Sequence, residues 1–205
     1  MSYFVFVCFC LVATFTPGPA VLLVVKNSAK FGFKKALLGI SGNVAAVMTL
    51  AILSVIGLSA VILASESAFV IMKLLGGGYL IYLGLNAWRS KNHFVVISSE
   101  KKPLVSSRTL FIEAYVTGIS NPKALAFYTA VFPQFISLQE SAFAQFSLLA
   151  LTFAICSFVA LSAYAWFALL GSKHLAKEVV VTWFHRLTGG LFIGFGSALL
   201  LSNRT

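Results

Sequence analysis

The tripeptide Asn121-Pro122-Lys123 interrupts an apolar run that extends from about Leu110 to about Ile136. A run of that length is sufficient to cross a bilayer, because the hydrocarbon core needs roughly 20 apolar residues in a helix. Proline removes a backbone donor, and a lysine at that depth costs about 3 kcal/mol on insertion scales. Ionisable residues inside a membrane span are candidates for function, so Lys123 is the first candidate site residue.

The residues before Lys123 predict a helix that ends and restarts inside the span. Asn121 is a good N-cap, and Pro122 suits the first helical position, whose N–H would have no partner in any case. Broken helices at membrane depth survive only where they are buried in protein or line a wet cavity. Their N-termini favour an anionic group such as a carboxylate. The alternative for Lys123 is a lysine that snorkels from a helix end, and its place in the middle of the run disfavours that.

Composition identifies a membrane protein rather than a soluble domain. The 205 residues are 60% hydrophobic and only 10% charged. The net charge of +10 comes from basic residues at the ends of apolar segments, which argues against nucleic acid as a partner. Aspartate is absent, and Cys8, Cys10 and Cys156 have no metal or disulfide spacing. We therefore expect no catalytic site, no metal and no cofactor.

Six apolar runs predict six transmembrane helices, at about residues 3–25, 36–64, 68–88, 110–136, 142–170 and 182–201. Lysine and arginine gather after the first, third and fifth runs, whereas the turns after the second and fourth contain Glu66 and Glu140. The positive-inside rule places the basic loops in the cytoplasm and both termini outside. We expect one domain over residues 1–205, with a cytoplasmic loop at about 89–109.

The two halves, at about residues 1–88 and 110–202, resemble each other. Thr16-Pro17 in the first span corresponds to Asn121-Pro122 in the fourth, with Thr16 as the predicted cap and Pro17 in the first helical position. The pattern Gly77, Gly78, Ile81 and Gly84 recurs as Gly189, Gly190, Ile193 and Gly196. Because each half has three spans, the second half must be inverted. The predicted fold is an all-α membrane protein with six helices in an inverted 3+3 repeat, helices 1 and 4 being broken at Pro17 and Pro122.

Two further polar residues lie within the predicted spans. Asn43 needs a hydrogen-bonding partner in the second span, and a role in a site and a role in helix packing are equally compatible with it. Glu113 lies near the inner end of the fourth span, where it could pair with a lysine or arginine of the adjacent loop. The repeated glycines are predicted to be packing surfaces, because small residues let membrane helices approach closely.

Several motifs together resemble the LysE/RhtB family of bacterial amino-acid exporters. They are Thr16-Pro17-Gly18-Pro19, Gly77-Gly78-Tyr79-Leu80-Ile81-Tyr82-Leu83-Gly84, Asn121-Pro122-Lys123 and Phe132-Pro133-Gln134-Phe135. The resemblance implies a multi-pass protein of the bacterial inner membrane that exports amino acids or close derivatives, driven by the proton motive force. Family members often carry acids at two places that here hold Asn43 and Ser157, which leaves Glu113 as the coupling candidate or, alternatively, a uniport-like mechanism.

The resulting hypothesis places a substrate site between the two broken helices. The predicted binding residues are Thr16, Pro17, Gly18, Pro19, Asn43, Asn121, Pro122 and Lys123. The expected partners are an amino-acid substrate and the lipid bilayer, and a homodimer is compatible with this hypothesis. Two alternatives stay open: a thiol–disulfide relay that uses Cys8 or Cys10 with Cys156, and a membrane assembly factor that transports nothing.

Overall fold

The computed structural model describes residues 3–64, 66–89, 105–136, 142–170 and 178–201. The regular structure of these residues is entirely helical, which confirms the predicted all-α class. The α-helices are α1 (Tyr3–Phe15), α2 (Pro19–Phe31), α3 (Phe33–Ala64), α4 (Glu66–Arg89), α5 (Ser107–Ile119), α6 (Pro122–Ala126), α7 (Ala142–Leu169) and α8 (Glu178–Leu201). A π-helical turn (Phe127–Val131) and a 3-10 turn (Phe132–Phe135) continue directly from α6.

Long apolar helices give the described part of the chain the character of a membrane protein. Phe33–Ile56 of α3 and Phe143–Leu169 of α7 are each long and apolar enough to cross a bilayer. α1 and α2 together make a third candidate span, bent by 54° at the break between them. Large apolar side chains face outward along the helices, among them Phe4, Leu75 and Ile155. Such a surface suits lipid rather than water.

After the first break, the helix begins two residues later than predicted. α1 ends at Phe15, and α2 begins at Pro19 with Gly18 as its extended N-cap. The predicted cap, Thr16, instead donates its hydroxyl hydrogen bond back to the carbonyl of Val12, one turn earlier. Each proline disfavours helical geometry in the residue before it, so Pro17 and Pro19 together keep Thr16 and Gly18 out of either helix. The predicted start of the helix at Pro17 is therefore wrong.

The second break agrees with the prediction. α5 ends at Ile119 and α6 begins at Pro122. The Oδ1 atom of the N-cap Asn121 accepts a hydrogen bond from the backbone N–H of Lys123, with 3.1 Å between the two atoms. Because the cap satisfies one of the free donors of the new helix, the chain can restart inside an apolar environment.

The basic segment after the first span is helical, although we predicted a loop. Lys26 and Lys30 belong to α2, and Lys34 and Lys35 lie in the first turn of α3. The two helices are separated by Gly32 alone, whose φ of 85° lies in the left-handed region. Lysine is a good helix former, and one glycine is sufficient to reverse the chain there.

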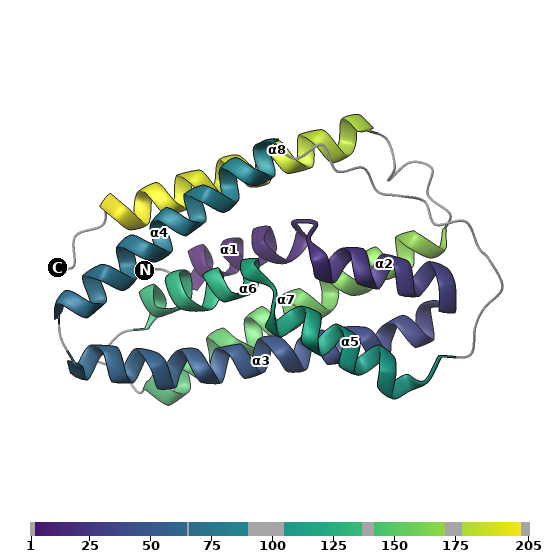
Figure 1. Cartoon of the computed structure of the whole chain (residues 1–205), viewed down its shortest axis with the longest axis horizontal. Helices are drawn as coiled ribbons and strands as arrows, with labels where there is room; N and C mark the ends of the chain where they lie inside the picture. Colours follow the sequence, from purple (N-terminus) through teal and green to yellow (C-terminus); the bar gives the residue numbers. More distant parts are fainter. Residues whose placement is uncertain (1–2, 65, 90–104, 137–141, 171–177, 202–205) are drawn as a thin grey trace.

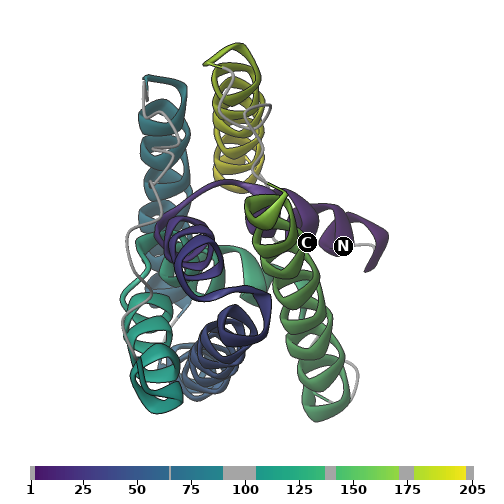
Figure 2. The same cartoon turned by 90° about the vertical axis from the view of Figure 1, so that its right-hand side faces the viewer.

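Close approach at glycines pairs α4 with α8 in antiparallel fashion (Figures 1 and 2). A Cβ atom added at Gly84 would lie 2.7 Å from the carbonyl oxygen of Gly189, and one added at Gly77 would lie 3.1 Å from that of Gly196. The backbones of α4 and α8 are therefore so close at these glycines that no side chain larger than a hydrogen atom fits between them. The prediction that the repeated glycines serve packing is confirmed at these positions.

α2 lies among α3, α5 and α7 when the molecule is viewed from its end (Figure 2). α5 runs parallel to α3, because Gly39 lies near Leu110 and Ala114 while Gly118 lies near Asn43. One buried cluster is rich in aromatic rings, among them Phe6, Phe127, Tyr128, Phe132 and Phe153. A smaller aliphatic cluster includes Val21, Val24, Ile40 and Leu161. A cavity lies where the two clusters meet.

Candidate functional site

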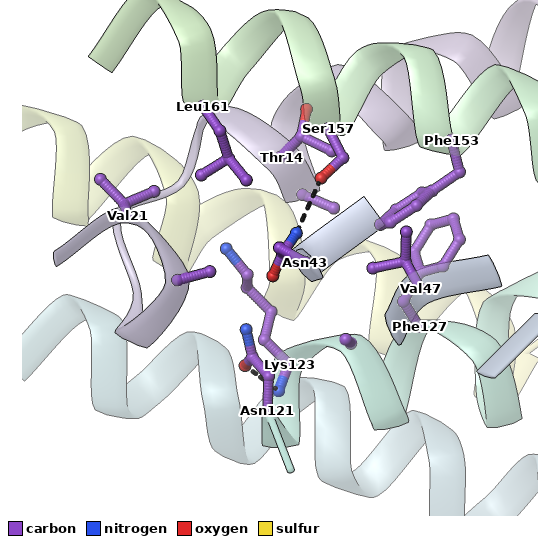
Figure 3. Close-up of a pocket in the computed structure, with 13 residues that line it drawn as sticks. Thr14, Val21, Asn43, Val47, Asn121, Lys123, Phe127, Phe153, Ser157 and Leu161 are labelled. Carbon is purple, nitrogen blue, oxygen red and sulfur yellow. Dashed lines mark hydrogen bonds between the residues drawn. The ribbon is translucent and has the colours of Figure 1, made fainter. Parts of the chain in front are cut away.

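The cavity lies beside both helix breaks and has a volume of about 30 Å³. Its polar lining residues are Thr14, Asn43, Asn121, Lys123 and Ser157, and its apolar lining includes Val21, Val47, Phe127, Phe153 and Leu161. These residues come from five helices and the π-helical turn, and they converge on one point (Figure 3). The centroids of the Phe127 and Phe153 rings are 4.4 Å apart, so the two rings form one wall together.

Lys123 joins the second helix break to the first. Its Nζ atom donates a hydrogen bond to the backbone carbonyl oxygen of Thr16, with 2.7 Å between the atoms. That carbonyl is available because the break deprives it of the N–H that an uninterrupted helix would supply. The ammonium group also lies against Gly18, where an added Cβ atom would be 3.5 Å from Lys123 Nζ. Predicted residues from both halves of the sequence thus meet at Lys123.

A tyrosine satisfies the neighbouring carbonyl of the same break. Tyr164 of α7 donates its hydroxyl hydrogen bond to the carbonyl oxygen of Phe15 at 2.6 Å. Sequence reasoning did not assign Tyr164 to the site. The available signal was that a tyrosine within an apolar helix requires a partner for its hydroxyl group.

Asn43 and Ser157 form a neutral polar pair on the cavity wall. Asn43 Nδ2 donates to Ser157 Oγ at 3.2 Å, and both side chains are buried (Figure 3). The pair links α3 to α7. Gly118 of α5 leaves the space for the amide, because a Cβ atom there would lie 2.9 Å from Asn43 Oδ1. The sequence had singled out Asn43, whereas its contact with Ser157 was not predicted.

The other predicted residues have different positions relative to the cavity. Asn121 is buried and lines it, while Pro17 and Pro19 are not among the lining residues and shape the break instead. Pro122 begins α6, but its side chain lies outside the described part of the structure. Glu113 does not line the cavity and forms an ion pair elsewhere. The cavity therefore combines one ammonium group with amides and hydroxyl groups, without a carboxylate among its lining residues.

Comparison with known proteins identifies the family. The model of the LysE type translocators matches residues 11–203. The chain belongs to this family. The match confirms the predicted resemblance and identifies a translocator rather than an enzyme.

Relatives of this LysE family member match over almost their whole length. A threonine efflux protein of Salmonella typhi is 28% identical over 94% of each chain. A homoserine/homoserine lactone efflux protein of Salmonella typhimurium is 30% identical over 92% of this chain and 90% of its own. The membrane protein YrhP of Bacillus subtilis is 31% identical over 88% of this chain and 89% of its own. No solved structure matches the chain.

Proposed function

We propose that this LysE family translocator exports amino acids or close derivatives across the bacterial inner membrane. The observation that carries the proposal is the meeting of Lys123 with the Thr16 carbonyl group between two broken helices, beside a polar cavity. Broken helices in the two halves of a chain are typical of substrate sites in secondary transporters. The threonine and homoserine efflux proteins among the relatives support the substrate class.

The contacts of Lys123 suggest how a zwitterion binds. The substrate carboxylate accepts a hydrogen bond from the ammonium group of Lys123. To make this bond, the ammonium group turns away from the carbonyl oxygen of Thr16. The α-ammonium group of the substrate then donates to that oxygen in place of Lys123. Each buried polar group exchanges one partner for another, so no donor or acceptor is left unsatisfied during binding.

The cavity wall favours a small substrate without a charged side chain. Asn43 and Ser157 supply donors and acceptors that suit a side-chain hydroxyl group, while Val47 and Phe153 contact its carbon atoms. Ligand pockets commonly occupy about 300–1,000 Å³. Because this cavity measures about 30 Å³, it must widen to admit an amino acid.

Several helix contacts support six spans in an inverted repeat. α5 runs parallel to α3, and α1 runs parallel to α7, because Tyr3 contacts Thr152 while Tyr164 contacts the carbonyl of Phe15. The third spans of the two halves, α4 and α8, are antiparallel to each other, as an inverted repeat requires. We propose that one half rocks against the other to give alternating access, driven by the proton motive force.

The test measures amino-acid release. Cells producing the protein and cells with an empty vector are loaded with a panel of dipeptides or with homoserine, and the amino acids in the medium are quantified. We expect one or a few small neutral amino acids, threonine or homoserine among them, to leave faster from cells that contain the protein. Equal release of every compound, with the protein present in the membrane, would contradict export and favour an assembly factor.

A further inference from the structure

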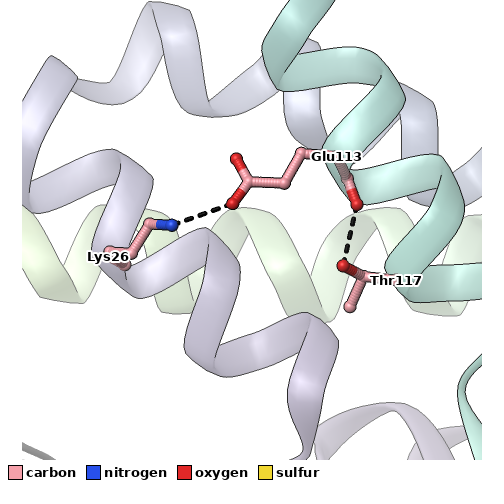
Figure 4. Close-up of polar contacts among 3 residues, drawn as sticks. All are labelled: Lys26, Glu113 and Thr117. Atoms are coloured by element: carbon pink, nitrogen blue, oxygen red, sulfur yellow. Dashed lines mark hydrogen bonds and ion pairs between the residues drawn. The ribbon is translucent and has the colours of Figure 1, made fainter.

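A second polar cluster lies outside the cavity, between α2 and α5. Lys26 Nζ and Glu113 Oε1 form an ion pair at 2.9 Å (Figure 4). The two side chains are 42% and 39% exposed, so neither is sealed inside the helix bundle. Among the side chains that the structure describes, Glu113 is the only carboxylate. The cluster therefore offers the negative charge that the lining of the cavity lacks.

Asn27, the residue after Lys26 on α2, supplies a buried amide without a partner in the described part of the chain. The side chain is 1% exposed, and neither Nδ2 nor Oδ1 has a hydrogen-bond partner among the described residues. A Cβ atom added at Gly39 of α3 would lie 3.8 Å from Asn27 Nδ2 and 3.7 Å from Ala114 Cβ, which adjoins Glu113 in α5. The amide thus lies where α2, α3 and α5 meet. Buried amides without partners are rare in folded proteins and require an explanation.

The cluster and the cavity follow one another along the lengths of α2 and α3. On α2, Asn27 lies six residues, or about 9 Å along the helix axis, beyond Val21, which lines the cavity. On α3, Gly39 lies one turn before Asn43, which also lines it. Beyond the cluster are the lysine-rich ends of α2 and α3, which the positive-inside rule places at the cytoplasmic surface. A substrate that moves from the cytoplasm to the cavity along these helices meets the cluster first.

We propose that Lys26, Asn27 and Glu113 form an entry site that binds a zwitterionic amino acid before it reaches the cavity. Glu113 accepts the α-ammonium group, Lys26 binds the carboxylate, and Asn27 hydrogen-bonds the substrate as it passes inward. Opening the ion pair costs little, because partly exposed pairs contribute little to stability, and the substrate replaces both partners. The proposal rests on the proposed export function, since it assigns a second site to the same substrate.

The entry site is tested by uptake into inside-out membrane vesicles, with radiolabelled L-threonine and L-homoserine as probes. Glu113→Gln and Lys26→Gln each remove one charge of the pair. We expect each variant to raise the KM at the cytoplasmic face roughly three- to tenfold, as for loss of a partly exposed charged contact. The matched controls Arg108→Gln on α5 and Lys30→Gln on α2 remove charges outside the pair and keep the wild-type KM.

Competition with a deaminated analogue tests the role assigned to Glu113. The 2-hydroxy acid that corresponds to each probe lacks the α-ammonium group, so it competes more weakly than the amino acid for the unaltered protein. Glu113→Gln should reduce this difference, because only the Thr16 carbonyl oxygen in the cavity then remains to bind the α-ammonium group. A Glu113→Gln variant that keeps the full difference would overturn the assignment.

Exchanging the charges of Lys26 and Glu113 distinguishes a pair that binds substrate from an ion pair that only stabilises the fold. Lys26→Glu combined with Glu113→Lys restores an ion pair but reverses the orientation in which a zwitterion binds. We expect the KM to stay raised in this double variant, whereas its return to the wild-type value would overturn the entry site.

A further comparison distinguishes failure of the entry site from failure of the proposed function. If the unaltered protein transports neither probe nor any amino acid of the release panel, export is contradicted and the entry site with it. If the unaltered protein transports but Glu113→Gln and Lys26→Gln keep the wild-type KM, the entry site alone is overturned.

Discussion

Replacing Gly84 with alanine tests the packing of α4 against α8. The new Cβ atom would lie 2.7 Å from the carbonyl oxygen of Gly189 and 2.9 Å from the backbone nitrogen of Ile193. Ordinary contact begins at 3.4 Å, so the carbonyl must recede by 3.4 minus 2.7, or about 0.7 Å. Backbone atoms cannot rotate away as a side chain can, and α4 and α8 must therefore separate. The same separation loosens the neighbouring contact between Gly77 and Gly196.

Gly78→Ala in the same helix is the matched control, because a Cβ atom there would meet nothing within 4 Å. Both substitutions gain about 0.5–1 kcal/mol from the better helix propensity of alanine, and that gain cancels in the comparison. What remains is the overpacking at Gly84, which typically costs about 1–3 kcal/mol. We therefore expect Gly84→Ala to be less stable than Gly78→Ala by about 1–3 kcal/mol.

The assay is reversible unfolding of the purified protein in mixed micelles, with sodium dodecyl sulfate as denaturant and helicity as the signal. Comparing the two variants gives the difference in free energy of unfolding directly. Equal stability of Gly84→Ala and Gly78→Ala would refute the reasoning, because it would mean that the two helices do not approach closely at this glycine.

Three further substitutions test other contacts with the same unfolding assay. Asn27→Leu replaces a buried amide that has no partners among the described residues by an apolar side chain of similar volume. Stability should therefore rise by about 1–3 kcal/mol, while the KM for export also rises. A loss of stability would reveal a partner for the amide. Tyr164→Phe leaves the Phe15 carbonyl without its donor and should cost about 1 kcal/mol, and an unchanged value would argue against that bond. Gly32→Ala forces alanine to a φ of 85° and should cost about 1–2 kcal/mol relative to Gly78→Ala, whereas parity would show that the turn is not left-handed.

Local sequence rules predicted the second helix break better than the first. At Asn121-Pro122 one good cap precedes one proline, so the rules have a single solution, and α6 begins there. At Thr16-Pro17-Gly18-Pro19 two capping residues each precede a proline, and both starts satisfy the rules. The hydrogen bond from Thr16 to the preceding turn decides in favour of Gly18. That bond depends on the three-dimensional path of the chain, which the sequence pattern does not contain.

The candidate site was predictable in its charged and capping residues but not in its contacts. Lys123 was identified because inserting a lysine in the middle of an apolar span has a high free-energy cost. Its partner is a backbone carbonyl, which carries no residue-specific signal in the sequence. The contact between Asn43 and Ser157 joins α3 to α7 across more than a hundred residues, and it needs the helices in place to be recognised. For Glu113, the sequence suggested pairing with a lysine or arginine of the adjacent loop, whereas the structure pairs it with Lys26 of α2.

The most direct test of the account is export by a Lys123→Ala variant, with Lys30→Ala as a matched control that removes a lysine outside the cavity. Cells loaded with the best substrate of the release panel are compared at equal amounts of membrane-inserted protein. The account predicts that release by Lys123→Ala falls to the level of the empty vector, while Lys30→Ala exports like the unaltered protein. Export by Lys123→Ala at the unaltered rate would contradict a substrate site at Lys123.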